Sequence, residues 1–383
     1  MSERAGQYLI QPGGCRVFIL APLPPDPPIR YSPELLSLLS EADRALARLD
    51  GIASVLPNRD LFIAMYVKKE ALLSSQIEGT QASLEGVLEF EADMKPDDSM
   101  DDIQEVVNYV RALHFGIKRL RELPMSLRLI KEVHGILMEG VRGQYKRPGE
   151  FRREQNFIGP LGGTIQEATF IPPPPDRLDQ LMGEWELFLH GDDVIPPLVR
   201  IGLSHAQFET IHPFMDGNGR TGRLLITLYL AWKEILASPL LYLSFYLKAN
   251  RTAYYDALTR VRKEGAWEDW LTFFLEGIRQ TSRAAGQTAQ EIIALKDDLI
   301  QKLSKYPETT LTVIRLVDLL FAKPVIGTQQ AAEHLEITAK RAGQLLRQFV
   351  DEGILREITG KRRYKKYLFQ PYVEIIARGT QVG

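Results

Sequence analysis

Apolar residues recur at intervals of three and four along most of this 383-residue chain, between residues that are typical of helix ends. Residues 32–34, Ser-Pro-Glu, supply an N-cap, a first-turn proline and a first-turn acid. The pattern predicts a mainly α-helical protein. The expected helices cover residues 32–51, 58–79, 101–122, 126–139, 176–190, 196–210, 219–235, 251–264 and 267–285.

One segment interrupts the helical pattern. Residues 153–175 contain Gly159, Gly162 and Gly163 and end in four consecutive prolines. Short apolar stretches flank the glycine pair, and paired glycines between strand-like runs favour a tight turn. We therefore expect a small β-hairpin on a helical body.

The C-terminal part differs from the rest of the chain in charge and in pattern. From Thr309 onward there are twelve Lys and Arg against seven Asp and Glu, whereas the whole chain has 47 against 49 and a net charge of −2. Helices are expected over 311–321, 328–335 and 338–352, followed by a two-stranded wing that turns at residues 359–360. This is the order of a winged helix-turn-helix domain. The alternative interpretation is a module that docks a partner or packs against the chain, with a solvated basic hairpin.

Composition favours a cytoplasmic protein. Cys15 is the single cysteine, which excludes an intrachain disulfide and a multi-cysteine zinc site and suits a reducing compartment. The longest largely apolar run, residues 224–232, is about half of a membrane span. The first residues include Glu3 and Arg4 but no apolar signal core. We expect a cytoplasmic location and no membrane partner.

The segment HPFMDGNGRTGR, residues 212–223, carries the chemistry and leads into an apolar helix. Residues 217–219, Gly-Asn-Gly, would let backbone N–H groups point inward where that helix begins, and such an arrangement binds phosphate. Arg220 and Arg223 are three residues apart, so they share a helical face and can reach oxygens of a polyphosphate.

Two further side chains of this segment suit a reaction at a nucleotide phosphate. Asp216 is a hard oxygen ligand, suited to Mg²⁺ that is held mainly by phosphates and water. His212, with an ordinary pKa near 6.5, could take a proton from an incoming hydroxyl. The other histidines, His134 and His205 among them, lack metal-ligand spacing and are expected to be packing or surface residues.

Other interpretations of the segment fit less well. Residues 217–222 satisfy the dinucleotide pattern G-x-G-x-x-G, but no buried strand precedes them and no strand-helix-strand unit surrounds them. A Walker A loop is excluded because no Gly-Lys-Ser/Thr follows. A glycine-rich helix cap with surface arginines is the structural alternative, and it leaves the clustering of His, Asp, Asn and two Arg unexplained.

The segment resembles the signature of Fic (filamentation induced by cyclic AMP) domain proteins, H-x-F-x-[D/E]-G-N-G-R-x-x-R, at every defined position. The resemblance extends to RGQYKRPGEFRREQNFIG before it and LSFYLKANRTAYYDAL after it. It implies a helical core with a β-hairpin flap and transfer of AMP from ATP to a protein hydroxyl. The implied site has His212 as general base, Asp216 as Mg²⁺ ligand, and as nucleotide-binding residues Gly217, Asn218, Gly219, Arg220, Thr221, Gly222, Arg223 and Tyr255.

The same resemblance implies an organisation into three regions. Residues 1–100 form an N-terminal helical region, 101–290 the Fic catalytic core, and 291–383 a linker helix with the winged helix. The flap, about 153–172, would hold the target's backbone by strand addition. By similarity, Tyr254 and Asn250 join Tyr255 at the adenine.

A second pattern predicts that the protein is autoinhibited. Ser74-x-x-x-Glu78-Gly79 resembles the Fic inhibitory pattern [S/T]-x-x-x-E-[G/N], here N-terminal to the core. That likeness implies a bidentate pair between Glu78 and Arg223, which would occupy the donors that the γ-phosphate needs. The structural alternative is an exposed helical pair, Ser74 and Glu78, capped by Gly79.

The sequence therefore predicts a protein adenylyltransferase that uses ATP and Mg²⁺ and is inhibited by Glu78. Removal of AMP, or transfer of another phosphate-containing group on the same fold, is one alternative. A DNA-binding regulator with a nucleotide-sensing core is another, with phosphate contacts by Lys361, Arg362, Arg363, Lys365 and Lys366. The expected partners are ATP, a hydroxyl-bearing target protein, and DNA or a protein at the winged helix. A homodimer is one outcome for the oligomeric state, because dimers are common among similar proteins.

Overall fold

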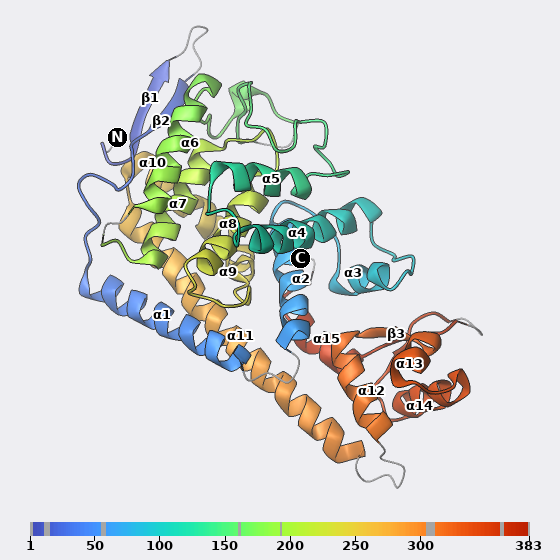
Figure 1. The fold of residues 1–383 in the computed structure, drawn as a ribbon. Helices are drawn as coiled ribbons and strands as arrows, with labels where there is room; N and C mark the ends of the chain where they lie inside the picture. The colour runs from blue at the N-terminus through green and yellow to red at the C-terminus, as the bar shows by residue number, and fades with distance from the viewer. Residues whose placement is uncertain are drawn as a thin grey trace.

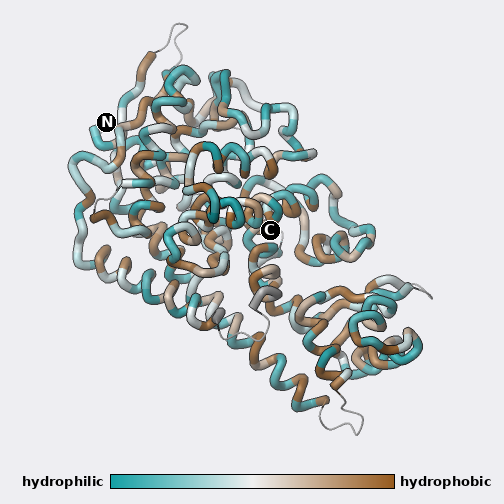
Figure 2. Tube along the Cα trace, viewed as in Figure 1, coloured by the Kyte–Doolittle hydropathy of each residue, from teal (hydrophilic) through white to brown (hydrophobic). Residues whose placement is uncertain are grey.

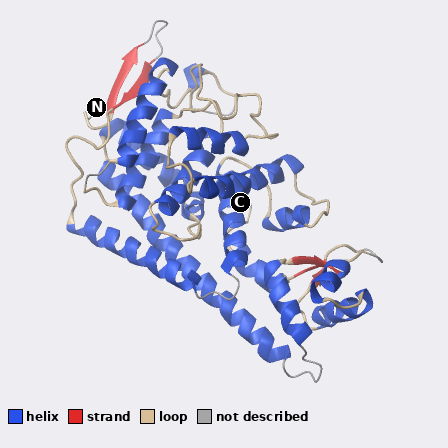
Figure 3. Cartoon of the chain, viewed as in Figure 1, coloured by secondary structure: helices blue, strands red, loops and turns tan. Residues whose placement is uncertain are grey.

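The computed structural model shows a mainly helical chain with two small antiparallel sheets, as the periodicity predicts (Figures 1 and 3). It describes residues 3–10, 16–54, 59–159, 162–191, 194–303, 311–360 and 364–381. A large helical body leads through one long helix into a smaller C-terminal module (Figure 1). The expected three-region boundaries remain predictions.

The helical body is built around two helices, α7 (Pro197–Ile211) and α8 (Asn218–Trp232). Every residue of α7 from Leu198 to Ile211 is buried, so this helix is enclosed on all sides. The helices around this pair are α2 (Arg59–Ile77), α4 (Met100–Arg119), α5 (Leu127–Leu137), α6 (Leu178–His190), α10 (Arg251–Glu264) and the short helices α3 (Leu84–Glu91) and α9 (Leu243–Ala249). The sequence did not indicate α3 or α9.

Helix α11 (Trp267–Leu303) is longer than predicted and runs beside α1 (Pro33–Ser54) in Figure 1. The predicted end near residue 285 is wrong, because buried residues continue at helical spacing through Ala289, Ile292 and Leu299. In Figure 2, hydrophobic and hydrophilic residues alternate along the C-terminal part of α11. The start of α1 is confirmed, since the Leu35 N–H donates to Ser32 Oγ at 3.2 Å.

The N-terminal region contains a strand pair that the helical prediction missed. Strands β1 (Gly6–Ile10) and β2 (Arg16–Leu20) are antiparallel, with Gly6 opposite Leu20. The Phe18 N–H donates to Ile171 O at 3.1 Å, which joins this pair to the end of the flap segment. Cys15 lies outside the described residues.

The flap segment has less β-structure than a hairpin. Among its described residues a single antiparallel bridge joins Ile158 and Phe170, and a 3₁₀ turn, η1 (Ile165–Glu167), lies between them. Residues 172–175 are prolines without an N–H to donate, so the pairing cannot continue in that direction. The segment ends at a second 3₁₀ turn, η2 (Pro175–Arg177).

The C-terminal module confirms the winged-helix order. Its elements are α12 (Leu311–Ala322), β3 (Val325–Gly327), α13 (Thr328–Leu335), α14 (Ala339–Asp351), β4 (Arg356–Glu357), β5 (Lys366–Leu368) and α15 (Gln370–Ala377). The wing strands β4 and β5 pair antiparallel, and β3 adds to β5 as a third strand. Neither β3 nor α15 was predicted, and α15 packs against α2 and α11.

No helix in the described part of the chain is long and apolar enough to cross a membrane.

Candidate active site

The turn between α7 and α8 contains the segment with the predicted chemistry. His212 caps α7 in a left-handed conformation (φ 51°, ψ 59°), and Gly217 (φ 72°) precedes the first residue of α8. The Asn218 side chain closes the turn, because Phe214 N donates to its Oδ1 and its Nδ2 donates to Phe214 O, both at 2.8 Å. The side chain of Asn218 therefore shapes the loop. The free backbone N–H groups at the start of α8 are the place where an anion would bind, and we call this the anion position.

His212 is fixed at the end of α7 by hydrogen bonds to its backbone. Its carbonyl accepts hydrogen bonds from Arg152 Nε at 3.0 Å and Asn156 Nδ2 at 3.2 Å. Its Nδ1 is buried and has no hydrogen-bond partner among the described residues. Burial, together with the charges of Arg262 and Arg152, lowers the pKa of His212 to about 4. The imidazole is therefore neutral near pH 7 and can accept a proton.

Glu78 occupies the anion position at the N-terminus of α8. A Cβ placed on Gly219 would lie 2.2 Å from Glu78 Oε1, so only glycine leaves room for the carboxylate there. Negative charge is stabilised at this end of a helix. The carboxylate of the second predicted pattern thus lies where the sequence predicts that a phosphate binds.

Arg223 joins the two patterns. Its Nη2 donates to Glu78 Oε1 at 2.7 Å and to Ser74 O at 2.9 Å, and its Nε donates to Ser74 Oγ at 2.9 Å. The single Glu78 contact corrects the expected bidentate pair, because Nε and the second N–H of Nη2 donate to the hydroxyl and backbone of Ser74 instead. Burial alone would raise the pKa of Glu78, but Arg223 holds it below its ordinary value. Gly79 follows with φ 99°.

Three other residues predicted to bind the nucleotide, Arg220, Thr221 and Gly222, do not line the cleft. Arg220 is buried and pairs with Glu105 on α4, with 3.2 Å between Nη1 and Oε2. Thr221 Oγ1 donates to Gly217 O at 2.8 Å, and Gly222 lies against the Glu209 carboxylate. In this state Arg220, Thr221 and Gly222 support the loop, and of the two predicted arginines Arg223 lines the cleft.

A cleft of about 750 Å³ opens in front of His212. Seven predicted residues line it: Glu78, His212, Asp216, Gly219, Arg223, Tyr254 and Tyr255. The flap contributes Ile158 and Phe170, and α10 contributes Arg251, Arg262 and Lys263. The wall therefore combines cations with apolar and aromatic surface, which suits an anionic ligand with an aromatic base.

Tyr254, suggested beside Tyr255, takes part in a buried chain of hydrogen bonds. His205 Nδ1 lies 3.1 Å from Gly222 O, so this nitrogen donates, and Nε2 then accepts from the Tyr254 hydroxyl at 2.9 Å. Burial lowers the pKa of His205 to about 3, which keeps the ring neutral. His205 therefore connects α10 to the motif helix. Asn250 does not line the cleft; its Nδ2 donates to Tyr246 O at 3.0 Å.

Asp216 has partners that sequence reasoning missed. Lys146 Nζ donates to its Oδ2 at 2.9 Å, and the Gly217 N–H donates to its Oδ1 at 2.8 Å. His134 accepts the Gly149 N–H on Nδ1, so its Nε2 donates to Asp216 O at 3.0 Å. Lys146 and Gly149 belong to the stretch RGQYKRPGEF that precedes the flap, and that stretch was the available signal.

Glu209 is a third carboxyl in the cleft, after Glu78 and Asp216, and no motif indicated it. It precedes His212 by one turn of α7, is 7% exposed, and its Oε1 has no hydrogen-bond partner within the described residues. Burial raises the pKa of Glu209 to about 7, with Arg223 opposing and Glu78 adding to the shift. The group therefore changes charge near neutral pH.

Glu209→Gln is expected to remove a loss of stability that the wild-type protein shows as the pH rises. Because the folded-state pKa is about 7 against an ordinary 4.5, the stabilising contribution is complete below pH 4.5 and is lost as the pH passes through about 7. Its size is at most about 3 kcal/mol. Urea unfolding near pH 5 and pH 8 should show the variant gaining on the wild type at the higher pH. A difference that does not change with pH would contradict the raised pKa, and Glu184→Gln is an exposed control.

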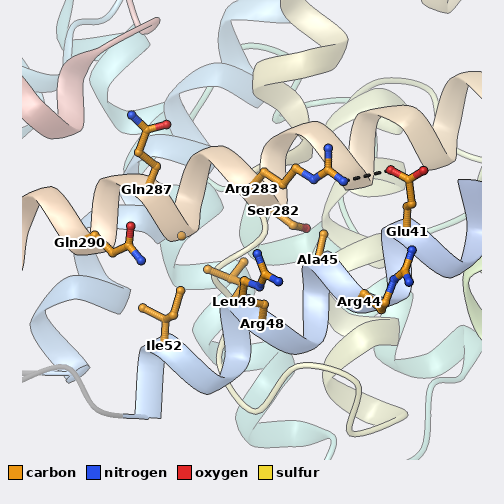
Figure 4. A pocket seen from close by; sticks show the side chains of 11 residues that line it. Glu41, Arg44, Ala45, Arg48, Leu49, Ile52, Ser282, Arg283, Gln287 and Gln290 are labelled. Atoms are coloured by element: carbon orange, nitrogen blue, oxygen red, sulfur yellow. Dashed lines mark hydrogen bonds and ion pairs between the residues drawn. The ribbon is translucent and has the colours of Figure 1, made fainter.

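A second hollow, of about 640 Å³, lies between α1 and α11 and is separate from this site (Figure 4). Arg44 and Arg48 line it from α1, and Arg283 of α11 donates to Glu41 at 2.9 Å. None of the predicted site residues lies there.

The cleft, the motif loop and the helical body define a Fic-type fold, and the comparisons agree. The model of the Fic/DOC family N-terminal region matches residues 36–118, and the Fic/DOC family model matches residues 124–230. An HTH DNA binding domain model matches residues 313–367. The chain belongs to the Fic/DOC family.

Named relatives cover the central part of the chain. It is 31% identical over 134 residues to "Protein adenylyltransferase Fic" of Drosophila erecta, and a similar match is found to that of Drosophila grimshawi. The match to the first spans 33% of this chain and 24% of the relative. This chain therefore covers about a quarter of those relatives' length.

Solved structures show the same fold. A Fic family protein from Desulfovibrio desulfuricans superposes with a TM-score of 0.58 over 90% of this chain and 98% of that one, at 21% identity. A Fic domain protein from Bacteroides thetaiotaomicron gives a TM-score of 0.53 over 66% of this chain and 97% of its own, at 16% identity. Because the first alignment covers 90% of this chain, it extends beyond the helical body.

Proposed function

We propose that this protein transfers AMP from ATP to a Ser, Thr or Tyr hydroxyl of a target protein. The observation that carries the proposal is the neutral imidazole of His212, which lines a cleft that also holds Arg223 and the start of α8. The similarity of the central region to proteins named adenylyltransferase supports the choice of transferred group. A base, an anion site and a cation beside one cleft are the parts that phosphoryl transfer needs.

The proposed reaction is an in-line displacement at the α-phosphorus. The target oxygen forms a bond to phosphorus, the bond to the β-phosphate bridging oxygen breaks, and pyrophosphate leaves. His212 takes the hydroxyl proton, which its lowered pKa allows without prior deprotonation. The N–H groups at the start of α8 and the Arg223 guanidinium stabilise the charge that develops on the phosphates.

Mg²⁺ is the proposed cofactor, and Asp216 would hold it. Asp216 already contacts a cation, the Lys146 ammonium, at 2.9 Å. Among the described residues no group of three or more His, Cys, Asp or Glu could hold a metal, so the protein would supply few ligands. That donor set fits Mg²⁺ bound largely by phosphate and water, where the ion would neutralise phosphate charge. Lys146 would have to leave Asp216 when the ion binds.

The target protein is proposed to bind at the flap, residues 153–172. The Ile158–Phe170 bridge leaves an extended backbone beside the cleft, and both side chains line the cleft. An extended peptide can add to such an edge through main-chain hydrogen bonds. This would bring a side-chain hydroxyl of the target toward His212.

Glu78 is proposed to inhibit the reaction by occupying the anion site. Its Oε1 contacts Arg223 at 2.7 Å and lies over Gly219, where a phosphate of ATP would otherwise bind. Glu78→Gly is expected to raise AMP transfer by at least about tenfold, because it removes the carboxylate that competes with phosphate for this site. A tenfold change corresponds to about 1.4 kcal/mol of binding free energy. The measurement is incubation with Mg²⁺ and α-³²P-labelled ATP, alone and with host lysate, followed by autoradiography and intact mass.

The control for this experiment is Glu139→Gly, which removes an exposed glutamate outside the cleft. Added mass equal to AMP on the labelled protein supports the proposal. Label with another mass would identify transfer of a different phosphate-containing group, and loss of AMP from a premodified target would identify the reverse activity. Absence of label from every variant would favour the second candidate function.

That second candidate is DNA binding by the C-terminal module. The helix-turn-helix match covers residues 313–367, and α14 exposes Lys340, Gln344 and Arg347 on one face. Exposed cations on such a helix suit contacts to phosphates and base edges. Lys365 and Lys366 of the wing are partly exposed, whereas Lys361, Arg362 and Arg363 lie outside the described residues.

A further inference from the structure

The end of the C-terminal module reaches the inhibitory helix. Residues 378–381 follow α15 and lie against the last turn of α2, and Figure 1 shows the C-terminal label beside that helix. Gln76 Nε2 donates to Thr380 O at 3.0 Å. Gln76 is two residues before Glu78, so this contact is made on the turn that positions the inhibitory carboxylate.

Lys248 joins the two segments from the end of α9. Its Nζ donates to Gln76 Oε1 at 2.7 Å and to Gln381 O at 2.7 Å. The amide of Gln76 is therefore fully engaged, because its Nε2 also donates to Ala82 O at 3.0 Å. Three separate parts of the chain thus meet at one side chain of α2.

The packing of residues 378–381 is close rather than superficial. Thr380 is 5% exposed, and its N–H donates to Ala377 O at 3.0 Å. Gly379 has φ 77°, and a Cβ placed on it would lie 2.1 Å from Phe245 Cε2. Glycine is therefore required here both for the backbone conformation and for the space beside the Phe245 ring.

Glu78 lies between two anchored positions. On one side Gln76 is held by Thr380 and Lys248. On the other, Thr80 Oγ1 donates to the buried Glu105 at 2.6 Å. The second anchor belongs to the helical body, whereas the first depends on the C-terminal module, which also forms ion pairs to the body through Arg356 and Arg378.

We propose that residues 378–381 are a latch that binds the last turn of α2 and positions Glu78 in the cleft. Through this latch the position of the C-terminal module controls access to the anion site. Release of the latch lets the end of α2 move and withdraws Glu78 from Arg223. The inference rests on the proposed inhibitory role of Glu78.

The test uses two variants of the full chain. Gly379→Val removes the fit against Phe245, and Lys248→Met removes both hydrogen bonds of Nζ without touching residues 378–381. Hydrogen exchange of a peptide that covers residues 74–80 is measured, because the amides of Glu78, Gly79 and Thr80 are hydrogen-bonded within this turn. We expect exchange and AMP transfer each to rise at least about fivefold, the factor that corresponds to loss of one or two hydrogen bonds.

Two control variants, and the same latch variants made in Glu78→Gly protein, distinguish release of the latch from general destabilisation of the fold. Gly353→Val introduces similar strain at φ 71° in open space, and Lys323→Met removes an exposed lysine. Neither should change exchange at residues 74–80. In the Glu78→Gly background the latch variants should add no further AMP transfer, because the inhibitor is already gone.

Unchanged exchange at residues 74–80 in both latch variants would overturn the proposal. Faster exchange with AMP transfer equal to the wild type, while Glu78→Gly is active, would also overturn it. If Glu78→Gly itself transfers no AMP, the proposed function fails, and hydrogen exchange still decides whether the latch holds α2.

Discussion

Replacing His212 by alanine in the Glu78→Gly background is expected to lower the rate of AMP transfer by about 10² to 10⁴, the usual value of general-base assistance. The alanine cannot accept the hydroxyl proton, while the fold should persist because the loop is held by Asn218 and by backbone contacts. Initial rates at saturating ATP measure the effect. His114→Ala, at an exposed position on α4, is the matched control and should keep the rate of its parent.

The pH dependence of the same reaction provides a second check on His212. Because burial lowers the pKa of this residue to about 4, the base is neutral over the ordinary range and is lost only as the pH falls through about 4. The acid limb of kcat/KM in the Glu78→Gly variant should therefore lie well below pH 6. An acid limb near pH 6.5, or a His212→Ala variant as active as its parent, would assign the base to another group.

Replacing Arg223 by methionine is expected to lower the free energy of unfolding by about 3 kcal/mol. Ser74 is completely buried, and without Arg223 its carbonyl and hydroxyl lose their donors. Glu78 also loses its cation, but it is partly exposed, so water compensates for some of that loss. Urea unfolding of the variant and the wild type measures the difference.

A double variant shows how much of this cost comes from the ion pair. Glu78→Gln in the Arg223→Met background removes the unpaired charge, so the two changes together should cost less than the sum of the single changes. Arg128→Met is the control, because this exposed arginine forms a surface pair that is worth little. A loss below about 1 kcal/mol for Arg223→Met would mean that the buried network contributes little to stability.

Much of the architecture could be predicted because its signals are local. The apolar spacing and the caps at Ser32 and Thr338 mark helices that the structure contains. The order of helices and wing strands marks the winged helix. By the same reasoning β1, β2, α3, α9 and α15 were missed, since short elements carry too few periodic positions to be distinguished from loops.

Some residues of the candidate site could likewise be predicted from local signals, and others could not. Residues 212–223 are contiguous, so their chemistry could be interpreted from residue types alone. The family resemblance added Glu78, which lies 145 positions before Arg223 in the sequence. The pairing of Arg220 with Glu105 and the buried Glu209 had no such signal, and the stretch that contains Lys146 did not indicate which side chain Lys146 contacts. Each depends on which helices pack together, and that is not encoded in the spacing along one helix.

By itself, then, the sequence determined the helical class, the winged-helix order and the identity of the groups around His212, because periodicity, capping and motif chemistry act over a few residues. Only the tertiary structure decided which charges meet, that Ser74 accepts two hydrogen bonds from Arg223, and that residues 378–381 contact Gln76. These contacts join segments more than 100 residues apart. They form because burial of polar groups is costly unless partners are brought to them by packing.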